Sequence, residues 1–327
     1  MIFFVVFLRF LAACLITNAH YTGGIYPTEL IANGGLLGDV IFFAVSGYCL
    51  YNIKHWFPRW YGKRLVRCYI PVLIVTAIYC LFGLYSFKEH NPFWWFVYPT
   101  NYHFVASIIL LYIPFYVIIK VRFFREKLPI VAGVVLLAHL IVYIFAYDKS
   151  YYHIDSVREP MIWFLFMEAM LIGAWFRQKD GIIRNNFHWY FPIFLIVLLG
   201  LYFGSKIVFS KTESLSHFQI VNQFVLLLVL FSILLLFSSL DSRLERMPAR
   251  IKKAIMFISE MTLEIYVVQY AIIDSLRPLY AGYFPQSWFA LTITILVAAT
   301  LLHFVCKGVL HVSDLIVSKI RIRTIKQ

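Results

Sequence analysis

Ionisable side chains interrupt the apolar segments of this sequence at positions where they could do chemistry. Arg9 lies in the apolar stretch 1–19, and His20 follows it eleven residues later. In an α-helix that continued this far, the two side chains would share one face about 16 Å apart. A charge inside a membrane-spanning helix costs at least ~2.5–3.5 kcal/mol, so each is a candidate for function. The alternatives are an Arg9 side chain that extends to the lipid headgroups and an interfacial His20.

Two polar side chains share one predicted helical face in the next apolar segment. Asp39 and Ser46 are seven residues apart, which corresponds to about two helical turns. Asp39 falls at the same end of its segment as His20, so its carboxylate could accept a hydrogen bond from the imidazole and fix its tautomer. An imidazole held in this way is a better general base. Helix capping by Asp39 and close helix packing through Ser46-Gly47 are the alternatives.

A basic pair stands just before the third apolar segment. Arg64 and Arg67 are three residues apart, and on a helix they would occupy neighbouring positions of one face. Guanidinium groups bind phosphate oxygens with two parallel hydrogen bonds, which suits the phosphates of coenzyme A. The alternative is the excess of Lys and Arg that any cytoplasmic loop of a membrane protein shows.

The composition determines what must position these residues. Of the 327 residues, 62% are hydrophobic and 14% are charged, compared with about 45–50% and about 25% in an average soluble domain. We therefore expect an all-α, polytopic transmembrane bundle of about ten helices that forms a single membrane domain over 1–327. The expected spans are 1–19, 34–53, 68–86, 104–121, 129–147, 160–176, 189–208, 219–240, 254–276 and 287–312.

The distribution of basic residues predicts the orientation. With the N-terminus inside, twenty-two of the 29 Lys and Arg residues fall in inner loops or the tail, so both termini are expected to be cytoplasmic. The net charge of +13 is then a topology signal, and no nucleic-acid partner is expected. No basic n-region precedes the first segment, so we expect a retained helix and not a cleaved signal peptide. No zinc-binding His pair is present, and no metal site is predicted.

Three features, in their order and spacing, resemble the acyltransferase-3 family of ten-helix membrane acyltransferases. They are Arg9 with His20, the run Phe42-Phe43-x-x-Ser46-Gly47-Tyr48, and Arg64-x-x-Arg67. A weaker resemblance continues through Tyr102-His103-Phe104. The resemblance implies transfer of an acyl group, most often acetyl, from cytoplasmic acyl-CoA to a hydroxyl of a carbohydrate bound for the cell surface. It also implies a location in the cell inner membrane.

The residues and the resemblance together give a hypothesis for the site. Acyl-CoA, most often acetyl-CoA, would bind at Arg64 and Arg67 with Ser46 and Tyr48. His20 would be the general base, with Asp39 orienting it and Arg9 stabilising the oxyanion. His103 is the competing candidate for the base, and Glu264 is an additional candidate for which an interhelical hydrogen bond or a partnership with Arg9 is the favoured role.

One alternative from another functional class stays open. Intramembrane charges also mark transport pathways, so a transporter or flippase for a lipid-linked or polymeric sugar is the rival reading. The sequence contains no convincing inverted repeat and no matching pair of broken helices, which favours the enzyme.

Overall fold

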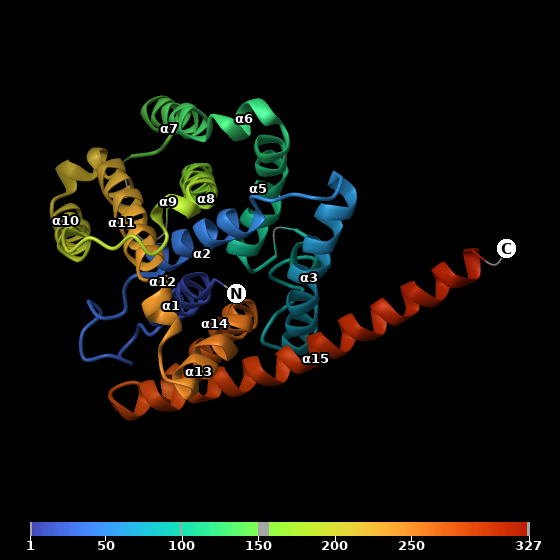
Figure 1. The fold of residues 1–327 in the computed structure, drawn as a ribbon. Coiled ribbons are helices and arrows are strands. Elements are labelled where there is room, and N and C mark those ends of the chain that lie inside the picture. The colour runs from blue at the N-terminus through green and yellow to red at the C-terminus, as the bar shows by residue number, and fades with distance from the viewer. Residues whose placement is uncertain (1, 99, 150–156, 326–327) are drawn as a thin grey trace. The chain divides into compact units, whose positions relative to one another are not determined.

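The computed structural model describes residues 2–98, 100–149 and 157–325, and within these ranges the chain contains helices and no strand (Figure 1). The α-helices are α1 (Phe3–Ala19), α2 (Gly35–Leu50), α3 (Phe57–Leu81), α4 (Pro92–Phe96), α5 (His103–Lys120), α6 (Arg122–Glu126), α7 (Leu128–Phe145), α8 (Met161–Gln178), α9 (Asp180–Ile183), α10 (Tyr190–Lys211), α11 (Ile220–Ser239), α12 (Asp241–Glu245), α13 (Ala249–Glu260), α14 (Thr262–Tyr280) and α15 (Gln286–Ile325). A short 3₁₀-helix covers Glu213–Phe218. The predicted all-α class is confirmed for the part of the chain that the structure describes.

Six of these helices are long and apolar enough to cross a bilayer: α3, α5, α7, α10, α11 and the Gln286–His311 part of α15. The pair α13 and α14 would make a seventh span if it crosses as one broken unit. α1 and α2 are apolar but have only 17 and 16 residues. A multi-pass membrane protein is thus confirmed, whereas the number of ten spans and the cytoplasmic termini stay predictions. Residues 150–156, in a predicted outer loop, lie outside the described residues.

Two helix boundaries differ from the predicted segments in a way that matters for function. The third helix begins at Phe57 instead of 68, so Arg64 and Arg67 lie inside α3. Pro58 occupies its first turn, where no backbone N–H is needed, and Trp60 is buried. The tenth helix continues to Ile325 instead of ending at 312.

The ninth predicted span, 254–276, is wrong as a continuous helix. The chain leaves helical geometry at Met261, which separates α13 from α14. Glu264 lies in the first turn of α14, and a carboxylate there interacts favourably with the positive end of the helix dipole. A new helix start is therefore favoured two to three residues before Glu264.

The helices form two compact units. The first contains residues 1–19, 33–61 and 107–260, and the second contains 20–32, 62–106 and 261–327. A single domain over 1–327 stays a prediction. Each unit is described by itself below.

The first unit is built around a close crossing of α2 and α8. A side chain at Gly47 would overlap the backbone carbonyl of Met170, and one at Gly173 would overlap that of Ala44. The two backbones therefore touch, as small residues allow in membrane helices. Gly47 serves helix packing here, whereas the predicted role of Ser46 stays a prediction.

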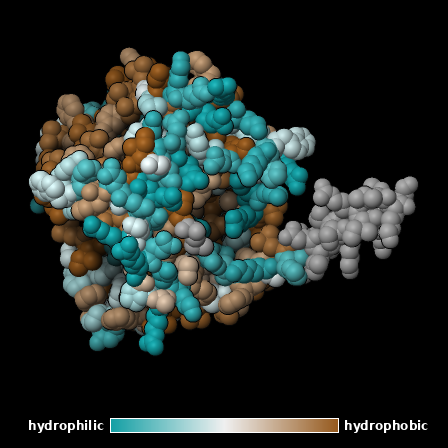
Figure 2. Space-filling model, in the orientation of Figure 1, coloured by the Kyte–Doolittle hydropathy of each residue, from teal (hydrophilic) through white to brown (hydrophobic). Residues whose placement is uncertain are grey.

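The lipid-facing surface of the first unit is visible on α7. Its exposed apolar residues recur every three or four positions, as one face of a helix requires; they are Ile130, Val134, Leu137, Ile141 and Ile144. Figure 2 shows hydrophobic residues along the upper left, where Figure 1 places α7 at the top and α10 at the left. The buried side of α7 carries His139.

In the second unit, α14 and α15 form an antiparallel hairpin that holds the loop 20–32. Three hydrogen bonds fix this loop: Tyr21 Oη with Thr292 Oγ1 at 2.8 Å, Gly282 N to Gly24 O at 2.9 Å and Ser287 Oγ to Ile25 O at 3.2 Å. Two of them use backbone carbonyls of the loop, so its path is fixed by its own main chain. His20, at the start of the loop, is thereby held against the hairpin.

Candidate functional site

The predicted site residues are divided between the two units. Arg9, Asp39, Ser46 and Tyr48 belong to the first unit, and His20, Arg64, Arg67, His103 and Glu264 belong to the second. The proposed hydrogen bond between His20 and Asp39 would join the units, and it stays a prediction. α1 ends at Ala19, so His20 directly follows the helix that carries Arg9.

His20 is half-buried and packs edge-on against an aromatic ring. Its imidazole meets the Tyr270 ring of α14 in a T-shaped arrangement, with 6.1 Å between the ring centroids. Burial lowers the pKa of His20, and the nearby charge of Arg277 lowers this pKa further. A His with a lowered pKa is neutral at ambient pH, which is the form that accepts a proton.

Arg277 is brought next to His20 by a glycine in the loop. Gly23 has φ +70°, and a Cβ atom there would overlap Cδ of Arg277. Glycine meets both conditions, because it adopts positive φ without strain and leaves room for the guanidinium stem. Asp274 pairs with Arg277 at 3.2 Å. The loop and α14 thus place a cation near the candidate base.

Tyrosine side chains form a hydrogen-bonded cluster in the same unit. Tyr85 and Tyr102 share a hydrogen bond of 3.2 Å between their hydroxyls, and Asn101 Nδ2 donates to Tyr85 Oη at 2.9 Å. Tyr102 Oη donates to the carbonyl of Val267 on α14 at 3.0 Å. Burial raises the pKa of both Tyr85 and Tyr102, so both phenols stay neutral hydrogen-bonding groups. Tyr85 acts electrostatically on Tyr270, which connects this cluster to the surroundings of His20.

His103, the competing base, has different surroundings. It is the first residue of α5 and is exposed, whereas its neighbours Tyr102 and Phe104 are buried. The side chain therefore points away from the packed side of the helix. His20, in contrast, is half-buried and packed against Tyr270, so its imidazole is held in place.

Arg64 and Arg67 lie on one face of α3, because they are i and i+3 inside a continuous helix. Arg67 is exposed and Arg64 is half-buried. No carboxylate among the described residues forms an ion pair with Arg67. Its guanidinium is therefore available to an anion.

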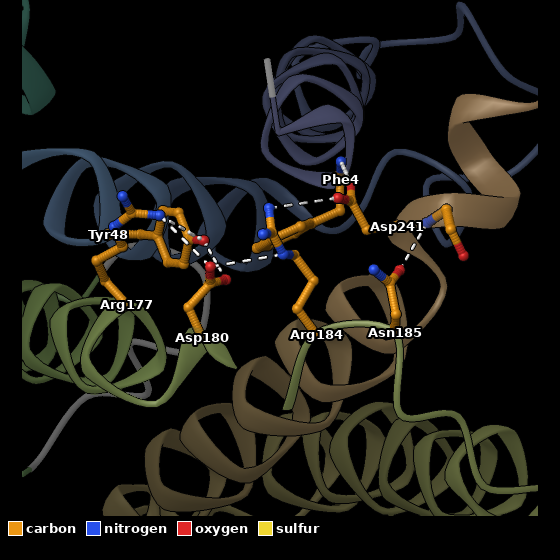
Figure 3. A network of polar contacts seen from close by, with 8 residues as sticks. Phe4, Tyr48, Arg177, Asp180, Arg184, Asn185 and Asp241 are labelled. Carbon is orange, nitrogen blue, oxygen red and sulfur yellow. Dashed lines mark hydrogen bonds and ion pairs between the residues drawn. The ribbon is translucent and has the colours of Figure 1, made fainter. Parts of the chain in front are cut away.

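Tyr48 is the centre of a polar network in the first unit (Figure 3). Its hydroxyl donates to Asp180 Oδ1 at 2.5 Å and accepts from Arg177 Nη1 at 3.3 Å. Arg184 reaches Asp180 Oδ2 at 3.5 Å and Asp241 Oδ2 at 3.8 Å. The phenol of Tyr48 is thus engaged with protein groups, and its predicted contact with CoA, like that of half-buried Ser46, stays a prediction.

The same network holds the beginning of α1. Asp241 Oδ1 accepts a hydrogen bond of 2.7 Å from the backbone N–H of Phe4, which lies in the first turn. Asp241 therefore caps α1 from a distant part of the chain, as a carboxylate at a helix N-terminus should. Arg9, five residues after Phe4, acts electrostatically on Cys49, as does Arg177. This interaction indicates that Arg9 lies near the end of α2.

Two buried histidines are each hydrogen-bonded to a glutamate of another helix. His139 Nδ1 lies 3.1 Å from Glu168 Oε1 in the first unit, and His303 Nδ1 lies 2.9 Å from Glu264 Oε1 in the second. The favoured role of Glu264, an interhelical hydrogen bond, is confirmed. His139 was not predicted from the sequence, although an ionisable residue within an apolar segment is the signal that finds it.

The network around Tyr48 was also not predicted, although the spacing of its charged residues along the sequence indicates it. Arg177, Asp180 and Arg184 stand at i, i+3 and i+7, which is the arrangement of charge pairs along a helical surface.

Comparison with known proteins gives one match. Residues 2–306 match the sequence model of a protein family described as an acyltransferase domain. No curated protein and no solved structure matches the chain significantly. The match covers every candidate residue discussed above, and only the end of α15 lies beyond it.

Proposed function

Because the chain belongs to the acyltransferase-3 family and is a membrane acyltransferase, we propose that it transfers an acetyl group from cytoplasmic acetyl-CoA to a hydroxyl of an exported or cell-surface carbohydrate. The observation that carries this proposal is the match of residues 2–306 to the family. The acceptor and the location in the inner membrane are parts of the proposal. The surroundings of His20 add the chemical argument.

The proposed reaction needs a base for the acceptor hydroxyl. His20 has a lowered pKa and is held by a loop with a fixed main chain, so it can take the proton of the hydroxyl as the oxygen attacks the thioester. Direct transfer then requires no nucleophile on the protein. Arg9 in the first unit is the proposed donor to the oxyanion.

The donor is proposed to bind through its phosphates at α3. Arg64 and Arg67 present two guanidinium groups on one helical face, and charge-assisted hydrogen bonds from such groups to phosphate are among the strongest in proteins. Tyr270, which packs against His20 and is 49% exposed, supplies a flat apolar face together with a hydroxyl group. This is a suitable contact for a sugar ring.

Purified protein in lipid vesicles tests the proposal. Incubation with acetyl-labelled acetyl-CoA and surface carbohydrates of the host cell should release CoA and place the label on the carbohydrate. A sugar transporter or flippase would leave the thioester intact while moving the carbohydrate across the vesicle membrane. That result, with no CoA released, would contradict the proposal.

A further inference from the structure

The pair Glu264 and His303 has the geometry of an oriented acid–base residue. Glu264 Oε1 lies 2.9 Å from His303 Nδ1, and this contact fixes the imidazole ring. His303 Nε2 is buried and has no hydrogen-bond partner among the described residues. His303 is 5% exposed and Glu264 is 7% exposed. One nitrogen is thus held by a carboxylate, and the other is left for a group that the described part of the chain does not supply. We refer to this pair as the Glu264–His303 dyad.

The dyad lies at a different level of the α14–α15 hairpin from His20. His20 packs on Tyr270, and Glu264 is six residues before Tyr270, or about 9 Å along α14. Tyr21, next to His20, is tied to Thr292, and His303 is eleven residues beyond Thr292, or about 16 Å along α15. Measured from the connection between the two helices, the dyad is therefore deeper than His20. In the predicted topology it is on the cytoplasmic side.

The two offsets along the helices, about 9 Å and about 16 Å, are of the order of size of a reacting thioester with its hydrogen-bond partners. A carbonyl group that is attacked by a hydroxyl on one side and loses a thiolate on the other needs a base for the first and an acid for the second. Each hydrogen bond takes about 3 Å, so the base nitrogen and the acid nitrogen are roughly 10 Å apart. The nucleotide end of CoA enters from the cytoplasmic side, so the sulfur faces the deeper of the two imidazoles.

We propose that His303, oriented by Glu264, is the general acid that protonates the leaving sulfur of CoA. The inference rests on the proposed function. The O–H bond of the acceptor breaks and its proton goes to His20, while the new O–C bond forms. The C–S bond then breaks, and the thiolate takes the proton of His303 Nε2. His20 later releases its proton and His303 regains one, so the products are the ester and CoA thiol.

The Glu264 carboxylate makes His303 suited to this role. The contact between Nδ1 and the carboxylate leaves Nε2 as the nitrogen that can meet the donor. In the proposed step, Nε2 carries the hydrogen that the leaving thiolate accepts. Glu264 itself is a positioning residue, since it acts through His303.

Changing the leaving group tests the proposal. Three acetyl donors are compared in the full-length protein: acetyl-CoA, its analogue with oxygen in place of the thioester sulfur, and an aryl thioester whose thiol is far more acidic. An alkyl thiol has a pKa of about 8.5, whereas an alcohol is a much poorer leaving group and an aryl thiol leaves without help. For each donor, kcat/KM of His303→Gln is divided by that of the unmodified protein.

We expect His303→Gln to slow transfer from acetyl-CoA by roughly 10²-fold, the lower end for a general acid. The loss should be larger with the oxygen analogue and less than about three-fold with the aryl thioester. For Glu264→Gln we expect the same ranking of the three donors, with a smaller loss of kcat/KM for each. His20→Ala should slow all three donors, because the acceptor hydroxyl still needs its base.

The matched control is the other buried pair. His139 is bonded to Glu168 in the same way, so His139→Gln removes an equally buried imidazole without touching the proposed acid. Any loss it causes should be equal for the three donors. An equal loss across the donors for His303→Gln would overturn the proposal and leave the dyad a structural link between α14 and α15. If the unmodified protein releases no CoA from any donor, the proposed function itself fails.

Discussion

At the scale of single residues, the two candidate bases differ in their surroundings. His20 is half-buried, packed on Tyr270 and held by a hydrogen-bonded loop, whereas His103 is exposed at the start of α5. A general base must be held within reach of the reacting hydroxyl and must be unprotonated when the reaction begins. These conditions single out His20, and they make its role testable by simple substitutions.

His20→Ala should reduce kcat by about 10²–10⁴-fold, the usual contribution of a general base. The affinity for acyl-CoA should stay nearly constant, because the donor phosphates are bound elsewhere in the proposed site. His103→Ala is the matched control and should keep near-normal activity. The turnover rates and the acyl-CoA binding isotherms of the folded variants are measured. Normal turnover of His20→Ala, together with no turnover of His103→Ala, would assign the base to His103 of α5.

Arg277→Gln should shift the acid limb of the pH–rate profile to higher pH. The pKa of His20 is lowered first by burial and then by the charge of Arg277, so removing this charge lets the pKa rise towards its ordinary value. More of the base is then protonated, and activity is lost, as the pH falls through that range. At high pH the rates should converge. The profile of kcat/KM against pH measures this shift, and Arg277→Lys, which keeps the charge, should leave it unchanged.

The double substitution of Arg64 and Arg67 by Ala should weaken acyl-CoA binding. Charge-assisted hydrogen bonds contribute about 1.5–3 kcal/mol each, so each lost contact should raise Kd by roughly ten-fold or more. Lys at both positions should restore only part of the affinity, since it keeps the charge but loses the planar fork. Titration with a non-hydrolysable acyl-CoA measures Kd, and unchanged affinity would leave the pair as topology signals.

At the scale of elements, the crossing of α2 and α8 determines where Tyr48 and its network lie. Gly47→Ala should lower thermal stability clearly, because its Cβ would overlap the carbonyl of Met170 and overpacking typically costs about 1–3 kcal/mol. Gly133→Ala in α7 is the matched control, since no atom lies within 4 Å of its Cβ. Unfolding midpoints in detergent give the comparison. Equal midpoints for the two variants would mean that the helices do not touch here.

Much of this arrangement was predictable from hydrophobicity, and some of it was not. The apolar segments predicted the helices, because every backbone N–H and C=O group in lipid must be hydrogen-bonded within its own helix. The start of α3 was misplaced because basic residues such as Arg64 lower the hydropathy of a segment that is nevertheless helical. The contact between Glu264 and His303 joins residues that are 39 positions apart. Such pairs depend on which helix faces pack together, and no local pattern encodes that choice.

At the scale of the whole molecule, the proposed reaction requires that the phosphates of the donor and the acceptor hydroxyl be bound on opposite sides of the membrane. The basic residues of α3 are proposed to bind the donor on one side of the membrane, and the loop 20–32 is proposed to bind the acceptor on the other. Acyl-CoA is made in the cytoplasm, so the orientation of the chain is part of the mechanism. An inverted chain would present Arg64 and Arg67 to a compartment without donor.

Cysteine labelling in intact cells tests this orientation. Leu30→Cys, at an exposed loop position, should react with an impermeant thiol reagent from outside, and Lys63→Cys, exposed on α3, should react only after the membrane is opened. Gly23 is unsuitable because its positive φ and its contact with Arg277 would strain a cysteine. The native cysteines are replaced first, since Cys14 and Cys49 are exposed. The reverse labelling pattern would place α3 outside and remove the cytoplasmic donor site. Because Lys and Arg are retained on the cytoplasmic side during insertion, the basic start of α3 predicts that Lys63→Cys stays protected.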